Sequence, residues 1–129
     1  MTTFLSEGHM TEATEALNAD AGFQTAMSGV DLGLQFEVTD APDGAVSYYL
    51  SVGDGTAALE LGVLDDDDSD ASVTSDYDTS AAIAKGELNV QMAFMTGKIK
   101  VGGNMAKVMM YQSLINEFAR VSSTLDLEF

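Results

Sequence analysis

A change from helical to alternating periodicity near residue 30 constrains the fold of this chain more than any other feature. Over residues 32–39, apolar side chains at every second position alternate with Gly, Gln, Glu and Thr, which is typical of a strand with one dry face. The alternation returns over residues 46–52 and 57–63, after loops that carry a proline and an Asp-Gly pair. The sequence therefore predicts three antiparallel strands in a meander. The expected dry face of the third strand consists of Ala57, Leu59, Leu61 and Val63.

Helical spacing is found on both sides of this meander. Residues 11–28 predict a first helix, which the stretch at 18–22 can divide into two pieces. The later elements are a weaker strand at 71–75, short helices at 79–85 and 87–96, a strand at 98–101, and a helix from the N-cap Asn104 to about Val121. This order predicts an α+β domain in which helices cover one face of a mostly antiparallel sheet.

The length of 129 residues favours one domain, since compact domains usually have ~100–150 residues. We expect residues 1–10 to form an N-terminal tail and residues 11–129 to form the domain. His9, the sole histidine, would then lie in the tail. No stretch is apolar enough for a spanning helix, and the first residues lack the basic start of a secretory signal. A cytoplasmic protein without stable membrane insertion is expected.

The formal net charge of −16 excludes a basic face for nucleic acid or an anionic membrane. Most acidic residues precede residue 88, whereas four of the five cations follow it. One interpretation is a solvated acidic surface that aids solubility. The other is that the less acidic region receives an anionic head group, with the candidates Lys98, Lys100 and Lys107.

Residues suited to catalysis are scarce. Cysteine is absent, which excludes thiol catalysis and thiolate metal sites, and a serine nucleophile would lack a base. The acidic loop at 65–70 fits a calcium-binding loop in neither frame, because the required glycine and the final glutamate are missing. We therefore expect no enzyme activity, no cofactor and no metal.

Methionine is concentrated late in the chain, where five of the eight fall between Met92 and Met110. Such side chains fill irregular space and repack around different apolar partners. One interpretation is an ordinary soft core, and the other is an apolar cavity built to hold a lipid. Gln112 lies within the apolar stripe of the last helix, and its amide needs a hydrogen-bond partner there.

Residues 96–112, with the sequence TGKIKVGGNMAKVMMYQ, resemble the end of the sterol carrier protein type-two family. That family has a Gly-Lys strand, then Gly-Asn-Met, then an apolar helix that contains a glutamine. The order of elements over residues 11–121 is also similar. The chain looks like a stand-alone bacterial member, although it lacks a C-terminal peroxisomal signal.

The resemblance implies a five-stranded sheet with helices over one face and an apolar tunnel for a fatty acid, an acyl-CoA or a sterol. It also implies that Gln112 faces this tunnel. We therefore expect non-catalytic lipid binding, with transfer or presentation of the ligand. The candidate ligand-binding residues are Phe36, Met92, Phe94, Met95, Met105, Val108, Met109, Gln112, Ile115 and Phe118.

Two alternatives remain open from the sequence. In the first, the tunnel is closed and the domain is an interaction module, in which Tyr49 and the acidic loop dock a partner enzyme or a second copy. In the second, the domain is an accessory to a lipid-modifying enzyme and holds its intermediate. An acidic surface disfavours transfer driven by contact with anionic bilayers.

Overall fold

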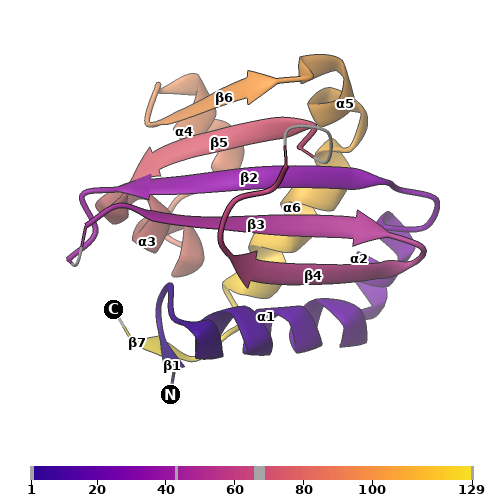
Figure 1. Ribbon diagram of the computed structural model, residues 1–129, viewed down its shortest axis with the longest axis horizontal. Helices are drawn as coiled ribbons and strands as arrows, with labels where there is room; N and C mark the ends of the chain where they lie inside the picture. Colours follow the sequence, from indigo (N-terminus) through magenta and orange to yellow (C-terminus); the bar gives the residue numbers. More distant parts are fainter. Residues whose placement is uncertain (1, 43, 66–68, 129) are drawn as a thin grey trace.

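A five-stranded sheet forms one layer of the molecule and most of the helices form a second layer behind it (Figure 1). The computed structural model describes residues 2–42, 44–65 and 69–128. The strand order across the sheet is β4-β3-β2-β5-β6. The bounds are β2 Leu32–Thr39, β3 Val46–Gly53, β4 Thr56–Leu61, β5 Ala71–Asp76 and β6 Ile99–Gly103.

The sheet is mixed, with one parallel pair at its centre. β2, β3 and β4 form the expected antiparallel meander, β5 lies parallel to β2, and β6 is antiparallel to β5. The α+β class, the five strands and the helical cover on one face are thereby confirmed.

Two of the helices that the periodicity predicts are interrupted in the structure. Asp20 ends the first helix and caps the second, since its Oδ1 accepts from the Phe23 N–H at 2.9 Å. Tyr111 interrupts the last helix, whose start is capped as expected by Asn104. The bounds are α1 Glu7–Ala19, α2 Ala21–Ala26, α3 Tyr77–Ala84, α4 Val90–Met95, α5 Met105–Met110 and α6 Gln112–Ser122.

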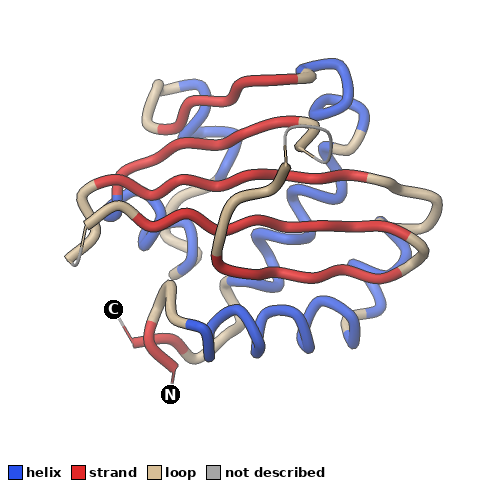
Figure 2. The backbone as a smooth tube through the Cα atoms, viewed as in Figure 1, coloured by secondary structure: helices blue, strands red, loops and turns tan. Residues whose placement is uncertain are grey.

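Helix α1 protects one of the two edges of the sheet, strand β4. Figure 2 shows it running along β4, and two of its side chains bond to the β4 backbone. Asn18 accepts from the Ala57 N–H at 2.9 Å and donates to the Ala57 carbonyl at 2.8 Å, while Thr14 Oγ1 accepts from the Leu59 N–H at 2.9 Å. Unpaired strand edges otherwise invite association with other chains, so α1 both covers the core and closes this edge.

The expectation of an N-terminal tail is wrong for residues 2–10. Strand β1 (Thr2–Thr3) pairs in parallel with β7 (Leu127–Glu128) at the other end of the chain, and α1 begins at Glu7. Met10 is buried. Strands of two residues are too short to produce a periodic pattern in the sequence, and their partners lie at opposite ends of the chain. The sequence pattern alone therefore does not show that the N-terminal segment is paired.

The core lies between the sheet and the helices, where Leu17, Phe23 and Leu114 from the helices are fully buried. The third strand departs from its expected dry face, because Leu61 is 39% and Val63 is 74% exposed. Strand β4 ends at Leu61, and Gly62 then takes a φ of +130°. The chain leaves the sheet at this glycine, so the alternation in sequence no longer corresponds to alternating faces.

Candidate functional site

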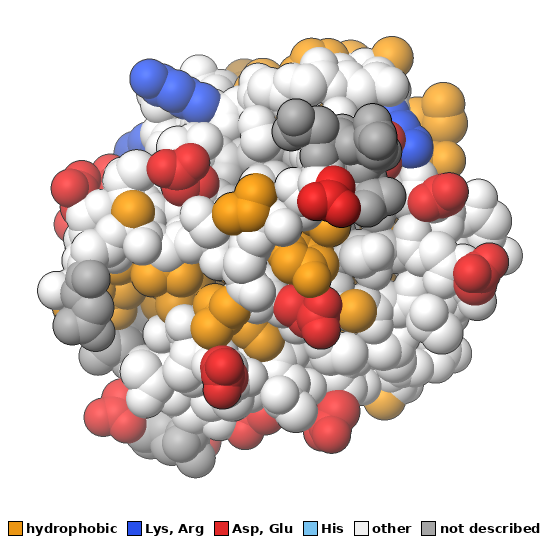
Figure 3. Space-filling model, viewed as in Figure 1, with side chains coloured by type: hydrophobic (Ala, Val, Ile, Leu, Met, Phe, Trp, Pro, Cys, Tyr) orange, Lys and Arg blue, Asp and Glu red, His pale blue; other side chains and the backbone are white. Residues whose placement is uncertain are grey.

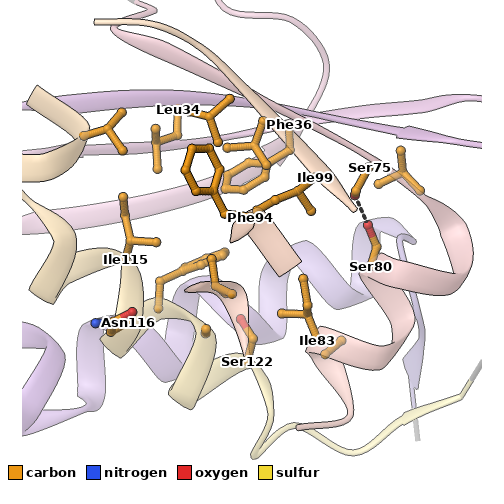
Figure 4. A pocket seen from close by; sticks show the side chains of 18 of the residues that line it. Leu34, Phe36, Ser75, Ser80, Ile83, Phe94, Ile99, Ile115, Asn116 and Ser122 are labelled. Atoms are coloured by element: carbon orange, nitrogen blue, oxygen red, sulfur yellow. Dashed lines mark hydrogen bonds between the residues drawn. The ribbon is translucent and has the colours of Figure 1, made fainter. Parts of the chain in front are cut away.

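A cavity of about 390 Å³ separates the inner face of the sheet from the helices behind it (Figure 4). Leu34 and Phe36 face it from the sheet, and Ile83 and Ile115 face it from the helices. Its volume falls within the ~300–1,000 Å³ of small-molecule sites. On three strands the lining residues stand at alternate positions, namely Leu34, Phe36 and Val38 of β2, Val73 and Ser75 of β5, and Ile99 and Val101 of β6. Tyr48 of β3 and Leu59 of β4 also line the cavity.

Helix α6 supplies the longest side of the cavity. Its lining residues run from Gln112 to Ser122, which corresponds to about 15 Å at 1.5 Å of rise per residue. Leu114 and Val121 instead point into the core. The helix thus buries one stripe in the core and presents a neighbouring stripe to the cavity. The other helices contribute Ser80, Ile83 and Ala84 from α3, and Val90, Phe94 and Met95 from α4.

Nine of the ten candidate ligand-binding residues line this cavity. They are Phe36, Phe94, Met95, Met105, Val108, Met109, Gln112, Ile115 and Phe118. Met92 does not line it and is 53% exposed. The helix expected at 87–96 extends only over α4. Met92 lies on a side of α4 that does not line the cavity.

The opening of the cavity is apolar. Phe94, Met95, Met105 and Met109 line the cavity and are also exposed, so they form its rim between α4 and α5. Figure 3 shows hydrophobic side chains along the edge of the molecule over β6 and α5, whereas acidic side chains are spread over the outer face of the sheet. Gln112 lies at the exposed end of α6 beside this rim, where its amide is accessible to solvent.

The three lysines proposed for an anionic head group lie outside the cavity lining. Lys107 is paired with Asp70, with Nζ 3.0 Å from Oδ1. Within residues 2–42, 44–65 and 69–128, neither Lys nor Arg lines the cavity. The site is therefore apolar with a few neutral polar groups, and the lysine prediction gains no support from this geometry.

Aromatic rings stiffen one wall. Phe36 stacks on Tyr48, its cross-strand neighbour, with ring centroids 4.8 Å apart, and it contacts Phe118 of α6 at 5.7 Å. Burial raises the pKa of the Tyr48 hydroxyl, so this group stays neutral. Such stacked pairs add stability beyond the area that they bury.

His9 is a site residue that the sequence patterns did not single out. It lines the cavity and is only 4% exposed. Its Nδ1 accepts from the Leu5 N–H at 3.0 Å. Burial lowers the pKa of His9 to about 4, against a smaller Coulombic effect of Glu12 that raises it, so the ring is neutral at pH 7. The spacing of His9, Ala13 and Leu17 continues the apolar face of the first helix and could have revealed this.

No group of three or more metal-ligating side chains occurs among the described residues. Part of the acidic loop, residues 66–68, lies outside that set, so the cation hypothesis there is not addressed by the structure. In the same described part of the chain, every helix is too short or too polar to cross a membrane.

Comparison with known proteins gives the fold and the family. In the crystal structure of a sterol carrier protein 2, 99% of that chain aligns with 95% of this one at 20% identity and a TM-score of 0.81. A possible sterol carrier protein from Thermus thermophilus aligns over 99% of this chain and 93% of its own at 19% identity and a TM-score of 0.79. Palmitated SCP2L2 from Aedes aegypti aligns over 84% of this chain and 91% of its own, at 18% identity and a TM-score of 0.59.

The sequence itself settles the membership. None of the curated proteins compared with it is a significant match. The family described as SCP-2 sterol transfer matches residues 13–116, a range that includes all five strands of the large sheet. The chain belongs to the SCP-2 sterol transfer family.

Proposed function

We propose that this protein binds a lipid in the cavity under α6 and releases it unchanged. The observation that carries the proposal is the cavity itself, about 390 Å³ of unfilled space with an almost wholly apolar lining. An ordinary soft core would be filled by its own side chains, since protein interiors pack like organic crystals. The Aedes aegypti relative, which has the same fold, is a palmitated protein, and this is consistent with a lipid ligand for this chain.

Burial of the ligand would drive binding. Each methylene removed from water contributes ~0.8 kcal/mol, so twelve methylenes contribute ~10 kcal/mol before the costs of ordering. Those costs bring the expected affinity to about the micromolar range. The flexible methionines of the rim can adjust to different lipid shapes.

The geometry around His9 supports binding without catalysis. A catalytic imidazole is oriented through its Nδ1–H by a carboxylate or a similar acceptor. Here Nδ1 is itself an acceptor, since it receives the Leu5 N–H. The His9 ring therefore lacks the carboxylate partner at Nδ1 that orients a catalytic histidine to take a proton from a serine.

Two measurements on the purified protein test this function. Denaturing mass spectrometry looks for a lipid that copurifies with the protein, and titration with Nile red, an uncharged apolar dye, looks for saturable binding. We expect one dye site per chain, with displacement by unlabelled lipids. A protein that carries no lipid and takes up neither dye nor lipid saturably would overturn the proposal.

The exposed rim favours a second candidate, the presentation of the ligand to a partner. The large apolar side chains exposed on α4 and α5 are Met92, Phe94, Met95, Met105, Met109 and Met110. Contiguous exposed apolar surface often marks an interaction site. Light scattering at increasing concentration distinguishes self-association through this surface from a monomer that only exchanges its lipid with solvent.

A further inference from the structure

Three of the polar side chains that line the cavity come from α1, α3 and β5. His9 of α1, Ser80 of α3 and Ser75 at the end of β5 all line the cavity. The Phe4 ring lies 5.4 Å from the His9 ring and 5.7 Å from the ring of Tyr77, the first residue of α3. This shared contact brings His9 close to the first turn of α3. The cavity lining therefore includes polar side chains besides its methionine rim.

The two serines are hydrogen-bonded to each other, whereas only one of the two ring nitrogens of His9 has a hydrogen-bond partner among the described residues. Ser75 and Ser80 share a hydrogen bond between their hydroxyls (Figure 4). His9 accepts the Leu5 N–H at Nδ1, so the proton of the neutral ring is on Nε2. None of the described residues accepts a hydrogen bond from this Nε2–H. No side-chain nitrogen or oxygen of the described residues is both fully buried and without a partner, so this Nε2 is accessible. Because the His9 ring lines the cavity, its donor is available to a ligand there.

The charge around His9 decides which kind of acceptor fits. No Lys or Arg lines the described part of the cavity, and Lys107 is engaged by Asp70. Glu12, on the same helix as His9, acts on the imidazole as a negative charge. An ionised carboxylate placed here would be desolvated without a counter-charge and close to a like charge, which is strongly unfavourable. A hydroxyl or carbonyl oxygen would avoid that cost.

We propose that the cavity selects uncharged lipids over fatty-acid anions of the same length, because His9 Nε2–H donates a hydrogen bond to a ligand hydroxyl or carbonyl oxygen. This inference rests on the proposed lipid-binding function and specifies its ligand class. It also assigns a binding role to His9, the only histidine of the chain.

The test compares ligands of equal chain length by displacement of Nile red at about pH 7.5. The ligands are 1-dodecanol, 2-dodecanone and laurate. We expect the alcohol and the ketone to compete at least about tenfold more tightly than laurate, as expected for an uncompensated buried charge. Equal or tighter competition by laurate would overturn the inference. If the dye and all three lipids fail to bind, the proposed function itself fails, so the two failures are distinguishable.

Two variants of His9 separate its donor from its structural role. In His9→Asn the side-chain oxygen lies as many bonds from Cα as Nδ1 does, so it can still accept the Leu5 N–H, but the donor into the cavity is lost. In His9→Gln the amide nitrogen lies as many bonds from Cα as Nε2 does, so the donor is kept. We expect His9→Asn to weaken 1-dodecanol by about fivefold, the effect of one neutral hydrogen bond, and to weaken diphenylhexatriene, a hydrocarbon dye without a hydrogen-bond acceptor, by less than about twofold.

His9→Gln should bind 1-dodecanol within about twofold of the original protein, and it keeps the test informative if the asparagine variant is unstable. A loss in His9→Asn that is equal for diphenylhexatriene and 1-dodecanol would show a merely structural role and overturn the inference. The same holds if His9→Asn binds 1-dodecanol as tightly as the original protein.

Discussion

Lys107 Nζ lies 3.0 Å from Asp70 Oδ1, which joins the first turn of α5 to the residue immediately before β5. The other carboxylate oxygen of Asp70 accepts from the Gly33 N–H at 2.8 Å, and its carbonyl accepts from the Asn104 N–H at 2.8 Å. Asp70 therefore connects β2, β5 and α5 at one end of the sheet. The lysine that the sequence offered as a contact for an anionic ligand serves this junction instead.

Because Asp70 makes more interactions at this junction than Lys107 does, we expect substitution of Asp70 to destabilise the protein more than substitution of Lys107. Lys107→Gln removes one partly exposed ion pair and should lower the free energy of unfolding by less than ~1 kcal/mol. Asp70→Ala also leaves the Gly33 N–H without its acceptor and should cost about 1–3 kcal/mol. Urea denaturation measures both, with Nile red binding expected to stay unchanged in Lys107→Gln. A larger loss in the lysine variant would contradict this account of the junction.

Gly103, at the end of β6, predicts a strong sensitivity to a single added methyl group. Its φ is +92°, and a Cβ there would lie 2.7 Å from the Asp70 carbonyl oxygen and 2.8 Å from the Ala71 Cα. Left-handed backbone costs a non-glycine residue roughly 1–2 kcal/mol, and the clash with backbone adds to it. Gly103→Ala should thus lower the free energy of unfolding by more than ~2 kcal/mol in urea denaturation.

Two neighbouring glycines provide controls for that measurement. Gly97 has a positive φ of +76° but no atom within 4 Å of an added Cβ, so Gly97→Ala reports the conformational cost alone. Gly102 lacks the positive φ, and its Cβ would approach only the Ser72 hydroxyl at 3.3 Å. If Gly103→Ala were no worse than both controls, the close packing between β5 and β6 would be disproved.

The sequence predicted the strands well because their apolar residues face one core at a fixed period of two. It predicted the cavity-lining face of the last helix for the same reason, since Val108, Ile115 and Phe118 repeat at helical spacing. Periodicity identifies which residues face inward. It does not say whether the space that they face is filled, so the choice between soft core and cavity depended on the structure.

The failures follow from interactions that are distant in the sequence. The pairing of β1 with β7 anchors the N-terminal segment and allows α1 to begin early enough to bury His9. The hydrogen bonds from α1 to the β4 backbone are at Ala57 and Leu59, whereas Leu61 and Val63 are exposed. Neither contact has a local pattern that a single sequence displays.

The cavity predicts different effects for two additions of an indole ring. Val73 lies on β5 and faces the cavity from the sheet, so Val73→Trp places the ring within the empty space. It should weaken binding of Nile red by at least about tenfold while leaving the fold stable, since cavity filling commonly stabilises proteins. Dye titration and urea denaturation measure the two effects.

Met109→Trp is the matched control for Val73→Trp. Met109 is 72% exposed at the rim, so the indole can lie in solvent and leave most of the volume free. We expect its affinity for Nile red to remain within about threefold of the original protein. Equal losses in both variants would place the dye at the rim rather than under α6.

His9 predicts a specific dependence of stability on pH. Its pKa is about 4 in the folded protein, lowered from 6.5 mainly by burial, whereas the unfolded chain has the ordinary value. Between these values the unfolded state binds the additional proton, so the free energy of unfolding is intact above about pH 6.5 and falls as the pH is lowered toward 4. The loss reaches about 2 kcal/mol by pH 5 and about 3 kcal/mol at the acid end.

The uncharged variant His9→Asn isolates this contribution from the carboxylates. Hydrogen bonds to Arg120 and to the Phe23 N–H lower the pKa of Asp20, and those with Thr79 lower that of Asp76, so both groups titrate below the range of interest in either protein. Urea denaturation at about pH 7.5 and pH 5 should show a decrease about 2 kcal/mol larger for the original protein than for the variant. Equal decreases in the free energy of unfolding for the two proteins would contradict this prediction. They would mean that the folded protein protonates His9 as readily as the unfolded chain does, and hence that water reaches the imidazole.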